Sequence, residues 1–157
     1  MKRWTAFTLA FLLTTGVAFG QQMAAPEPQK YTPALGEFML NAQARHAKLW
    51  FAGSANNWEL AEYLIDELKE GLEDAGKYIP VLKGVPIGQM IGPSLDGPID
   101  DMEKVIKAKD RTRFMATFTR LTEACNSCHQ AAGRPFIVVQ RPSGPLFTNQ
   151  SFTPAKK

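Results

Sequence analysis

The chain has 157 residues, of which 45% are hydrophobic and 21% charged, and its formal net charge is +3 at pH 7. This length is enough to bury one hydrophobic core. The nearly balanced charge excludes the strongly basic surface that nucleic-acid-binding domains carry, and no acidic block indicates a polycationic partner.

The first 20 residues have the pattern of a secretory signal peptide. Lys2 and Arg3 precede an apolar stretch at residues 6–19, and the small residues Ala18 and Gly20 suit a cleavage site just before Gln21. A membrane anchor is the alternative, but it needs about 20 apolar residues. We therefore expect export to the bacterial periplasm, with no stable membrane span after cleavage.

The next part of the chain predicts a leader and two helices. Residues 21–32, rich in Gln, Pro and Ala, are expected to form a flexible leader. From Pro33 to Gly53 apolar residues recur every three or four positions, as on one face of an amphipathic helix. A second helix is expected to begin at Asn56 or Asn57, either of which can cap the free backbone N–H groups.

Residues 76–98 contain four prolines and five glycines, so we expect no regular element there. Long connections of this kind are usually functional or packed over another part of the protein. A third, shorter helix is expected from Pro98 to Lys109. The fourth is expected to begin after an N-cap at Asp110 and to end at Gly133.

These elements together predict an all-α four-helix bundle over residues 33–133. Residues 134–157 contain a short β-prone stretch followed by three prolines among polar residues. We expect them to form an extended tail that is packed on the bundle or partly disordered.

The most specific signal is the C-x-x-C-H motif at Cys125-Asn126-Ser127-Cys128-His129. Two thiols three positions apart on a helical turn can reach the two vinyl groups on one edge of a haem, and the following histidine can bind the iron. A redox disulfide or a zinc site are the alternatives. Zinc would need further ligands, of which only His46 and His129 remain, and neither alternative explains the histidine after the second cysteine.

We therefore expect one covalently bound haem c per chain, attached through Cys125 and Cys128, with His129 as the proximal iron ligand. Arg134 is close to the motif and could pair with a haem propionate, although an arginine after a helix end is as often solvated.

The second axial ligand of the iron is expected on the first helix, if that helix is the antiparallel neighbour of the fourth. Met39 and His46 are seven residues apart, which places both on the same face. His46 is one candidate distal ligand and Met39 is the alternative; an empty or water-filled position is the third. A buried histidine or methionine can also be an ordinary core residue.

These features resemble the class II c-type cytochromes, the cytochrome c prime group, over residues 33–133. The resemblance implies a four-helix bundle with C-x-x-C-H on the last helix and a distal side formed by the first, and it carries over for Cys125, Cys128 and His129. A distal methionine occurs in low-spin members, so Met39 matches the family and His46 departs from it. The long tail is another departure, and Ala132 and Gly133 replace the family's aromatic and arginine. The resemblance also implies a homodimer as a candidate assembly.

The predicted function is electron transfer by an exported mono-haem cytochrome that exchanges electrons with redox partner proteins. The alternative is a five-coordinate haem protein that binds nitric oxide or carbon monoxide. An enzyme that reduces peroxide would need a distal Arg–His pair, which the sequence does not identify, so enzymatic activity is not expected.

Overall fold

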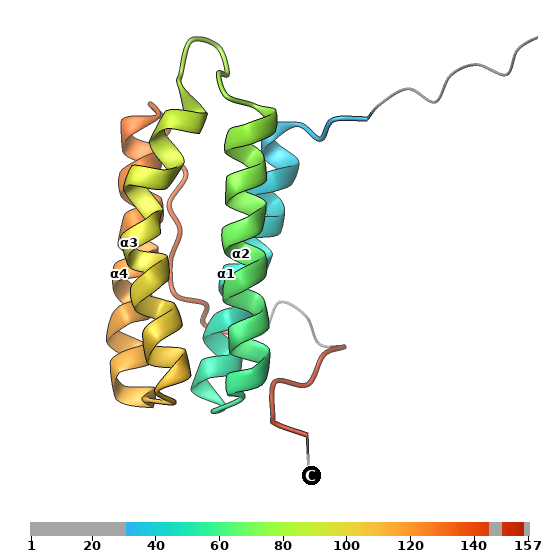
Figure 1. Cartoon of the computed structure of the whole chain (residues 1–157), viewed down its shortest axis with the longest axis vertical. Coiled ribbons are helices and arrows are strands. Elements are labelled where there is room, and N and C mark those ends of the chain that lie inside the picture. The colour runs from blue at the N-terminus through green and yellow to red at the C-terminus, as the bar shows by residue number, and fades with distance from the viewer. Residues whose placement is uncertain (1–30, 145–148, 156–157) are drawn as a thin grey trace, which may run out of the picture. The chain divides into compact units, whose positions relative to one another are not determined.

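The structure is a computed structural model that describes residues 31–144 and 149–155. It contains the helices α1 (Leu35–Ser54), α2 (Trp58–Tyr78), α3 (Ile87–Lys107) and α4 (Arg111–Ala131) (Figure 1). The only β-type pairing among the described residues is an isolated bridge between Leu82 and Val85. The predicted all-α four-helix bundle is confirmed. The predicted signal peptide (residues 1–20) and residues 21–30 of the predicted leader lie outside the described residues.

The helices follow one another up and down, because short connections join antiparallel neighbours. α1 packs on α2, α2 on α3 and α3 on α4, whereas α1 and α4 make the fewest contacts of the neighbouring helices. Figure 1 shows α1 and α2 as one pair and α3 and α4 as the other. The start of α1, the end of α4 and the α2–α3 connection therefore lie at the same end of the bundle.

Local sequence signals set three of the helix ends as predicted. The side chain of Asn57 accepts a hydrogen bond from the backbone N–H of Leu60 (3.3 Å), and that of Asp110 accepts one from Arg113 (2.9 Å). Gly133 has a φ of +69°, which glycine adopts without strain. This conformation lets the N–H of Arg134 reach the carbonyl of His129 (2.8 Å), and so closes the end of α4.

The prediction for residues 76–98 was wrong. α2 continues to Tyr78 and α3 begins at Ile87, so the irregular connection spans only residues 79–86, and Pro93 and Pro98 lie inside a helix. A proline costs about 3 kcal/mol in a helix interior. Burial outweighs this cost, because each fully buried aliphatic side chain contributes roughly 1.5–3 kcal/mol. α3 buries four of them at four-residue steps from its first residue: Ile87, Ile91, Leu95 and Ile99.

Two glycines of this segment allow a close approach between α2 and α3. A Cβ atom on Gly88 would lie 2.8 Å from the carbonyl oxygen of Gly76 and 3.3 Å from the Cα of Pro80. The N–H of Gly88 also donates to the carbonyl of Pro80 (3.0 Å). These glycines are therefore points of contact between helices.

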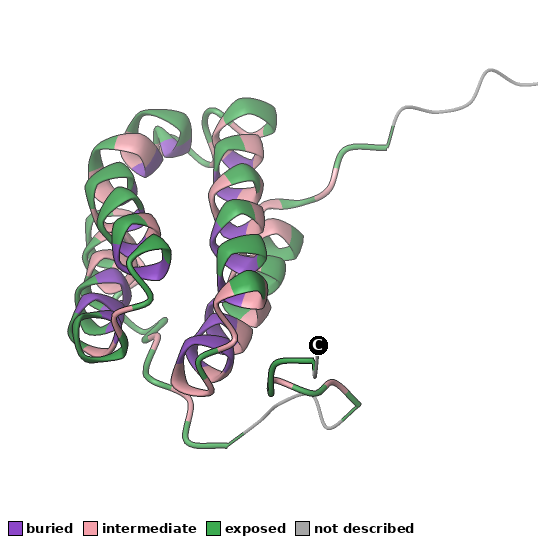
Figure 2. Cartoon of the chain, turned by 60° about the horizontal axis from the view of Figure 1, so that its bottom comes forward, coloured by how far each residue is buried: buried purple, intermediate pink, exposed green. Residues whose placement is uncertain are grey.

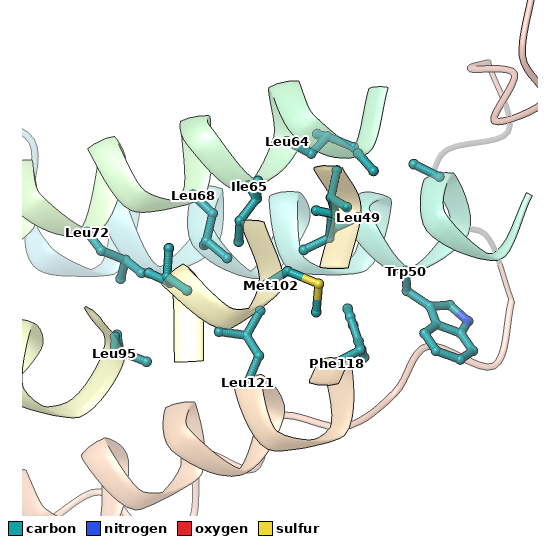
Figure 3. Close-up of a cluster of buried hydrophobic side chains, with 14 of the residues drawn as sticks. Leu49, Trp50, Leu64, Ile65, Leu68, Leu72, Leu95, Met102, Phe118 and Leu121 are labelled. Carbon is teal, nitrogen blue, oxygen red and sulfur yellow. The ribbon is translucent and has the colours of Figure 1, made fainter. Parts of the chain in front are cut away.

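The hydrophobic core lies between the helices, whose buried faces point inward in Figure 2 and whose outer faces are exposed. Its side chains come from all four helices, and Figure 3 shows Leu49, Ile65, Leu68, Met102, Phe118 and Leu121 meeting in the interior. At the end of the bundle where α4 begins, aromatic rings fill the space; the ring centroids of Trp50 and Phe118 are 5.0 Å apart. Among the described residues, no helix is long and apolar enough to cross a membrane.

Candidate functional site

A cavity of about 530 Å³ lies at the other end of the bundle, where α1 begins and α4 ends. Its walls come from all four helices, from the α2–α3 connection and from the tail, and they are predominantly apolar. Leu82 and Val85 line it, so the α2–α3 connection, which is shorter than predicted, packs over this cavity. The volume lies within the range of about 300–1,000 Å³ that is typical of small-molecule and cofactor sites.

The three predicted haem-attachment residues all line this cavity. Cys125 and Cys128 are half-buried on the last turns of α4, and both are free thiols. Burial, together with the neighbouring Cys128, raises the pKa of the Cys125 thiol to about 11, so this thiol is protonated at neutral pH. His129, on the same wall, is the next residue of the helix.

The orientation of His129 is set by a residue of the tail. Its Nδ1 atom is 2.9 Å from the carbonyl oxygen of Ile137. Because a carbonyl can only accept, Nδ1 donates this hydrogen bond, so in the neutral form of the ring the lone pair is on Nε2. Metal-binding histidines in proteins are usually held in this way, with one ring nitrogen donating to a carbonyl or carboxylate and the other free for the metal.

The tail runs back along α4 between the two helix pairs (Figure 1). The side chain of Asn126 makes two hydrogen bonds to the backbone of Val139, and the guanidinium of Arg141 lies 4.7 Å from the centre of the Trp50 ring. Further on, the ring centroid of Phe152 is 5.4 Å from that of Phe51. Residues 137–139 consequently form part of the cavity wall.

Both predicted distal candidates, Met39 and His46, line the cavity from α1. His46 is only 3% exposed, and burial lowers its pKa to about 4, so its ring is neutral at pH 7. Its Nε2 atom is 2.9 Å from Oγ1 of Thr122. Because the Thr122 hydroxyl donates to the carbonyl of Phe118 (2.9 Å), it accepts from His46, which leaves Nδ1 as the ring nitrogen with a lone pair.

Arg134 also lines the cavity and is its only permanently charged side chain among the described lining residues. Its guanidinium donates to the carbonyl of Gly133 (3.1 Å) and keeps further N–H groups for an anion at the cavity mouth.

The zinc alternative needs a cluster of ligands. In residues 31–144 and 149–155, no three His, Cys, Asp or Glu side chains are grouped so that they could hold a metal ion. A haem iron does not need such a cluster, because the porphyrin supplies four of its ligands and the protein only the axial ones.

Sequence reasoning missed Asn126, Ile137, Val139 and Thr122 as parts of this site. The C-x-x-C-H motif leaves position 126 free, and the β-prone stretch 136–139 carries no signal for the helix against which it lies. No protein-family model, no curated protein and no solved structure matches the chain, so the argument for a function rests on this site.

Proposed function

We propose that the chain is an exported mono-haem c-type cytochrome that transfers electrons, with the haem bound covalently to Cys125 and Cys128 and with His129 as its proximal ligand. One observation carries the proposal: the two thiols and the imidazole of His129 line a single apolar cavity, and the bond to Ile137 leaves Nε2 of His129 available for a metal.

The residues present fit a haem c. The donor set consists of two thiols at the required spacing and one imidazole, the wall is apolar like the porphyrin faces, and Arg134 offers a cation to a propionate. When bound, the haem would supply an iron that accepts and returns one electron.

The protein's own residues would tune this exchange. The thioethers to Cys125 and Cys128 would keep the cofactor from dissociating. The Ile137 carbonyl would raise the basicity of His129, which favours the ferric state, whereas the apolar wall disfavours the more highly charged state. Met39 is our preferred distal ligand: the bond from Nε2 to Thr122 leaves His46 only Nδ1 for the iron, whereas the Met39 thioether makes no described hydrogen bond.

The same proposal includes the resemblance to class II cytochromes, a location in the periplasm and electron exchange with redox partner proteins. It includes no enzymatic activity.

A five-coordinate haem protein that binds nitric oxide or carbon monoxide is the second candidate. It is favoured by the apolar cavity wall, which offers few polar groups beside the position that a gas would occupy.

The test is production of the full chain in a bacterium with an active haem c maturation system. We expect the denatured protein to carry the mass of one haem and to give the haemochrome spectrum of two thioethers. Cys125→Ala and Cys128→Ala should each give the spectrum of one thioether, and Ser127→Ala, inside the same motif, should give that of two. A wild-type chain without covalent haem would contradict the proposal.

Absorption spectra of the ferric and ferrous protein separate the two candidates. Low-spin spectra and no reaction with carbon monoxide would support the electron carrier, whereas high-spin spectra and rapid binding of carbon monoxide would support the gas-binding protein.

A further inference from the structure

Asn126, the first free position of the C-x-x-C-H motif, makes an unusual contact for a side chain on a helix. Its Nδ2 donates to the carbonyl of Val139 (2.9 Å), and its Oδ1 accepts from the N–H of the same residue (2.7 Å). The amide thus satisfies both backbone groups of one tail residue, as a neighbouring β-strand would. The other free position, Ser127, donates to the carbonyl of Glu123 in its own helix (2.9 Å) and makes no described hydrogen bond to the tail.

We call the two hydrogen bonds between Asn126 and Val139 the clamp. Val139 lies two residues beyond Ile137, whose carbonyl accepts from His129. The segment is anchored on its other side by the turn after α4, where the N–H of Ile137 donates to the carbonyl of Arg134 (3.0 Å). Ile137 is therefore held between two fixed points. Since an extended chain advances only about 3.3 Å per residue, little slack remains for its carbonyl to move away from Nδ1 of His129.

The side chain of Ile137 does not provide this anchoring, because Ile137 is 46% exposed and its neighbours Phe136 and Val138 are 76% and 70% exposed. Burial of these side chains in the core therefore contributes little to fixing this stretch. Apart from the bond between His129 and Ile137 itself, the hydrogen bonds that the structure shows between α4 and residues 136–139 are those of Asn126.

We propose that Asn126 is a positioning residue for the proximal ligand: by clamping Val139 it holds the Ile137 carbonyl where it accepts the Nδ1–H of His129. This inference rests on the proposed function. The hydrogen bond from Nδ1 makes a histidine a more basic ligand, and loss of such a partner typically changes metal affinity by about 10–100-fold. A more basic ligand stabilises the ferric state, so loosening the clamp raises the reduction potential.

The test compares Asn126→Ala with Ser127→Ala in the full-length, haem-loaded protein. For Asn126→Ala we expect faster hydrogen exchange at the Val139 amide. The iron–histidine stretching frequency in the ferrous Raman spectrum should be lower, recorded in proteins whose second axial position has been emptied by replacing its ligand (Met39→Leu or His46→Gln). We also expect about a tenfold shift of the redox equilibrium toward the ferrous state, equivalent to about 59 mV. Ser127→Ala should leave all three unchanged.

Two further variants each remove one hydrogen-bonding group of the clamp. Asn126→Asp keeps the acceptor for the Val139 N–H but loses the donor, and it should restore the Val139 exchange rate and the stretching frequency in part. Val139→Pro removes the N–H from the opposite side. If both changes act through one clamp, the double variant Asn126→Ala/Val139→Pro should shift the potential no further than the larger single shift. These variants also carry the comparison if Asn126→Ala does not accumulate.

The outcomes separate this inference from the proposed function. A variant with covalent haem, faster exchange at Val139 and an unchanged stretching frequency and potential would overturn the positioning role while leaving the cytochrome intact. A wild-type chain without covalent haem would overturn both, and exchange at Val139 would then report only a structural bond.

Discussion

Nε2 of His46 on α1 and Oγ1 of Thr122 on α4 lie 2.9 Å apart in the protein interior. The bond joins the two neighbouring helices that contact each other least, next to the cavity that opens between them. The ring of His46 also packs on Phe118 with a centroid distance of 4.4 Å. A buried polar pair therefore links α1 to α4 beside the cavity, in addition to the aromatic contacts between these two helices.

Replacing Thr122 by valine should destabilise the protein by about 1–3 kcal/mol, because the Nε2–H of His46 would stay buried without an acceptor. The free energy of unfolding in urea measures this. Thr112→Val, at an exposed position of the same helix, is the control and should change it by less than about 0.5 kcal/mol. Equal effects of the two variants would show that the buried bond contributes nothing.

The free energy of unfolding should decrease as the pH is lowered from 6.5 to about 4, because His46 titrates in this range. Its pKa is 6.5 in the unfolded chain and about 4 in the folded protein, so the unfolded chain takes up the proton first as the pH falls. The contribution of His46 to the free energy of unfolding is complete above pH 6.5. It is lost progressively as the pH is lowered to about 4, by about 3 kcal/mol in all.

His46→Gln, which keeps a hydrogen-bonding group beside Thr122, isolates this effect. The free energy of unfolding in urea, measured from pH 7 to pH 4.5, should decrease more steeply for the wild type than for His46→Gln. Parallel curves would mean that His46 is not the group responsible.

Gly88 and Gly97 make a matched pair within α3. A Cβ on Gly88 would press against the backbone of Gly76, so Gly88→Ala should destabilise the protein by about 1–3 kcal/mol. A Cβ on Gly97 would meet nothing within 4 Å, and Gly97→Ala should stabilise the helix by about 0.5–1 kcal/mol. Thermal or urea unfolding should therefore give changes of opposite sign; destabilisation by both would contradict the close contact as the cause.

The distal ligand can be identified from the spin state of the haem-loaded protein. The bond to Thr122 leaves His46 only Nδ1 for the iron, whereas the Met39 thioether makes no described hydrogen bond. We therefore expect Met39→Leu to convert low-spin ferric spectra to high-spin and to remove the band near the red edge that is attributable to sulfur. His46→Gln should leave both features in place. The reverse pattern would assign the ligand to His46, as the sequence alone also allowed.

Much of this architecture follows from local sequence rules. The spacing of apolar residues predicts α1, α2, α4 and the later part of α3. Asn57 and Asp110 mark helix starts through their own side chains, and Gly133 marks the end of α4 through its backbone conformation. The C-x-x-C-H motif predicts its site for the same reason, because its three functional residues are neighbours on one helical turn.

Other features of the structure depend on contacts between residues of different elements, which the local sequence does not encode. Pro93 and Pro98 lie in a helix because the apolar side chains around them are buried against the other helices, and Gly88 matters because of Gly76. Three hydrogen bonds likewise join residues of different elements: His46 with Thr122, His129 with Ile137, and Asn126 with Val139. The sequence alone predicts which residues would hold a haem. Only the folded chain decided which hydrogen bonds orient them, because each of these bonds requires a partner that packing brings from another element.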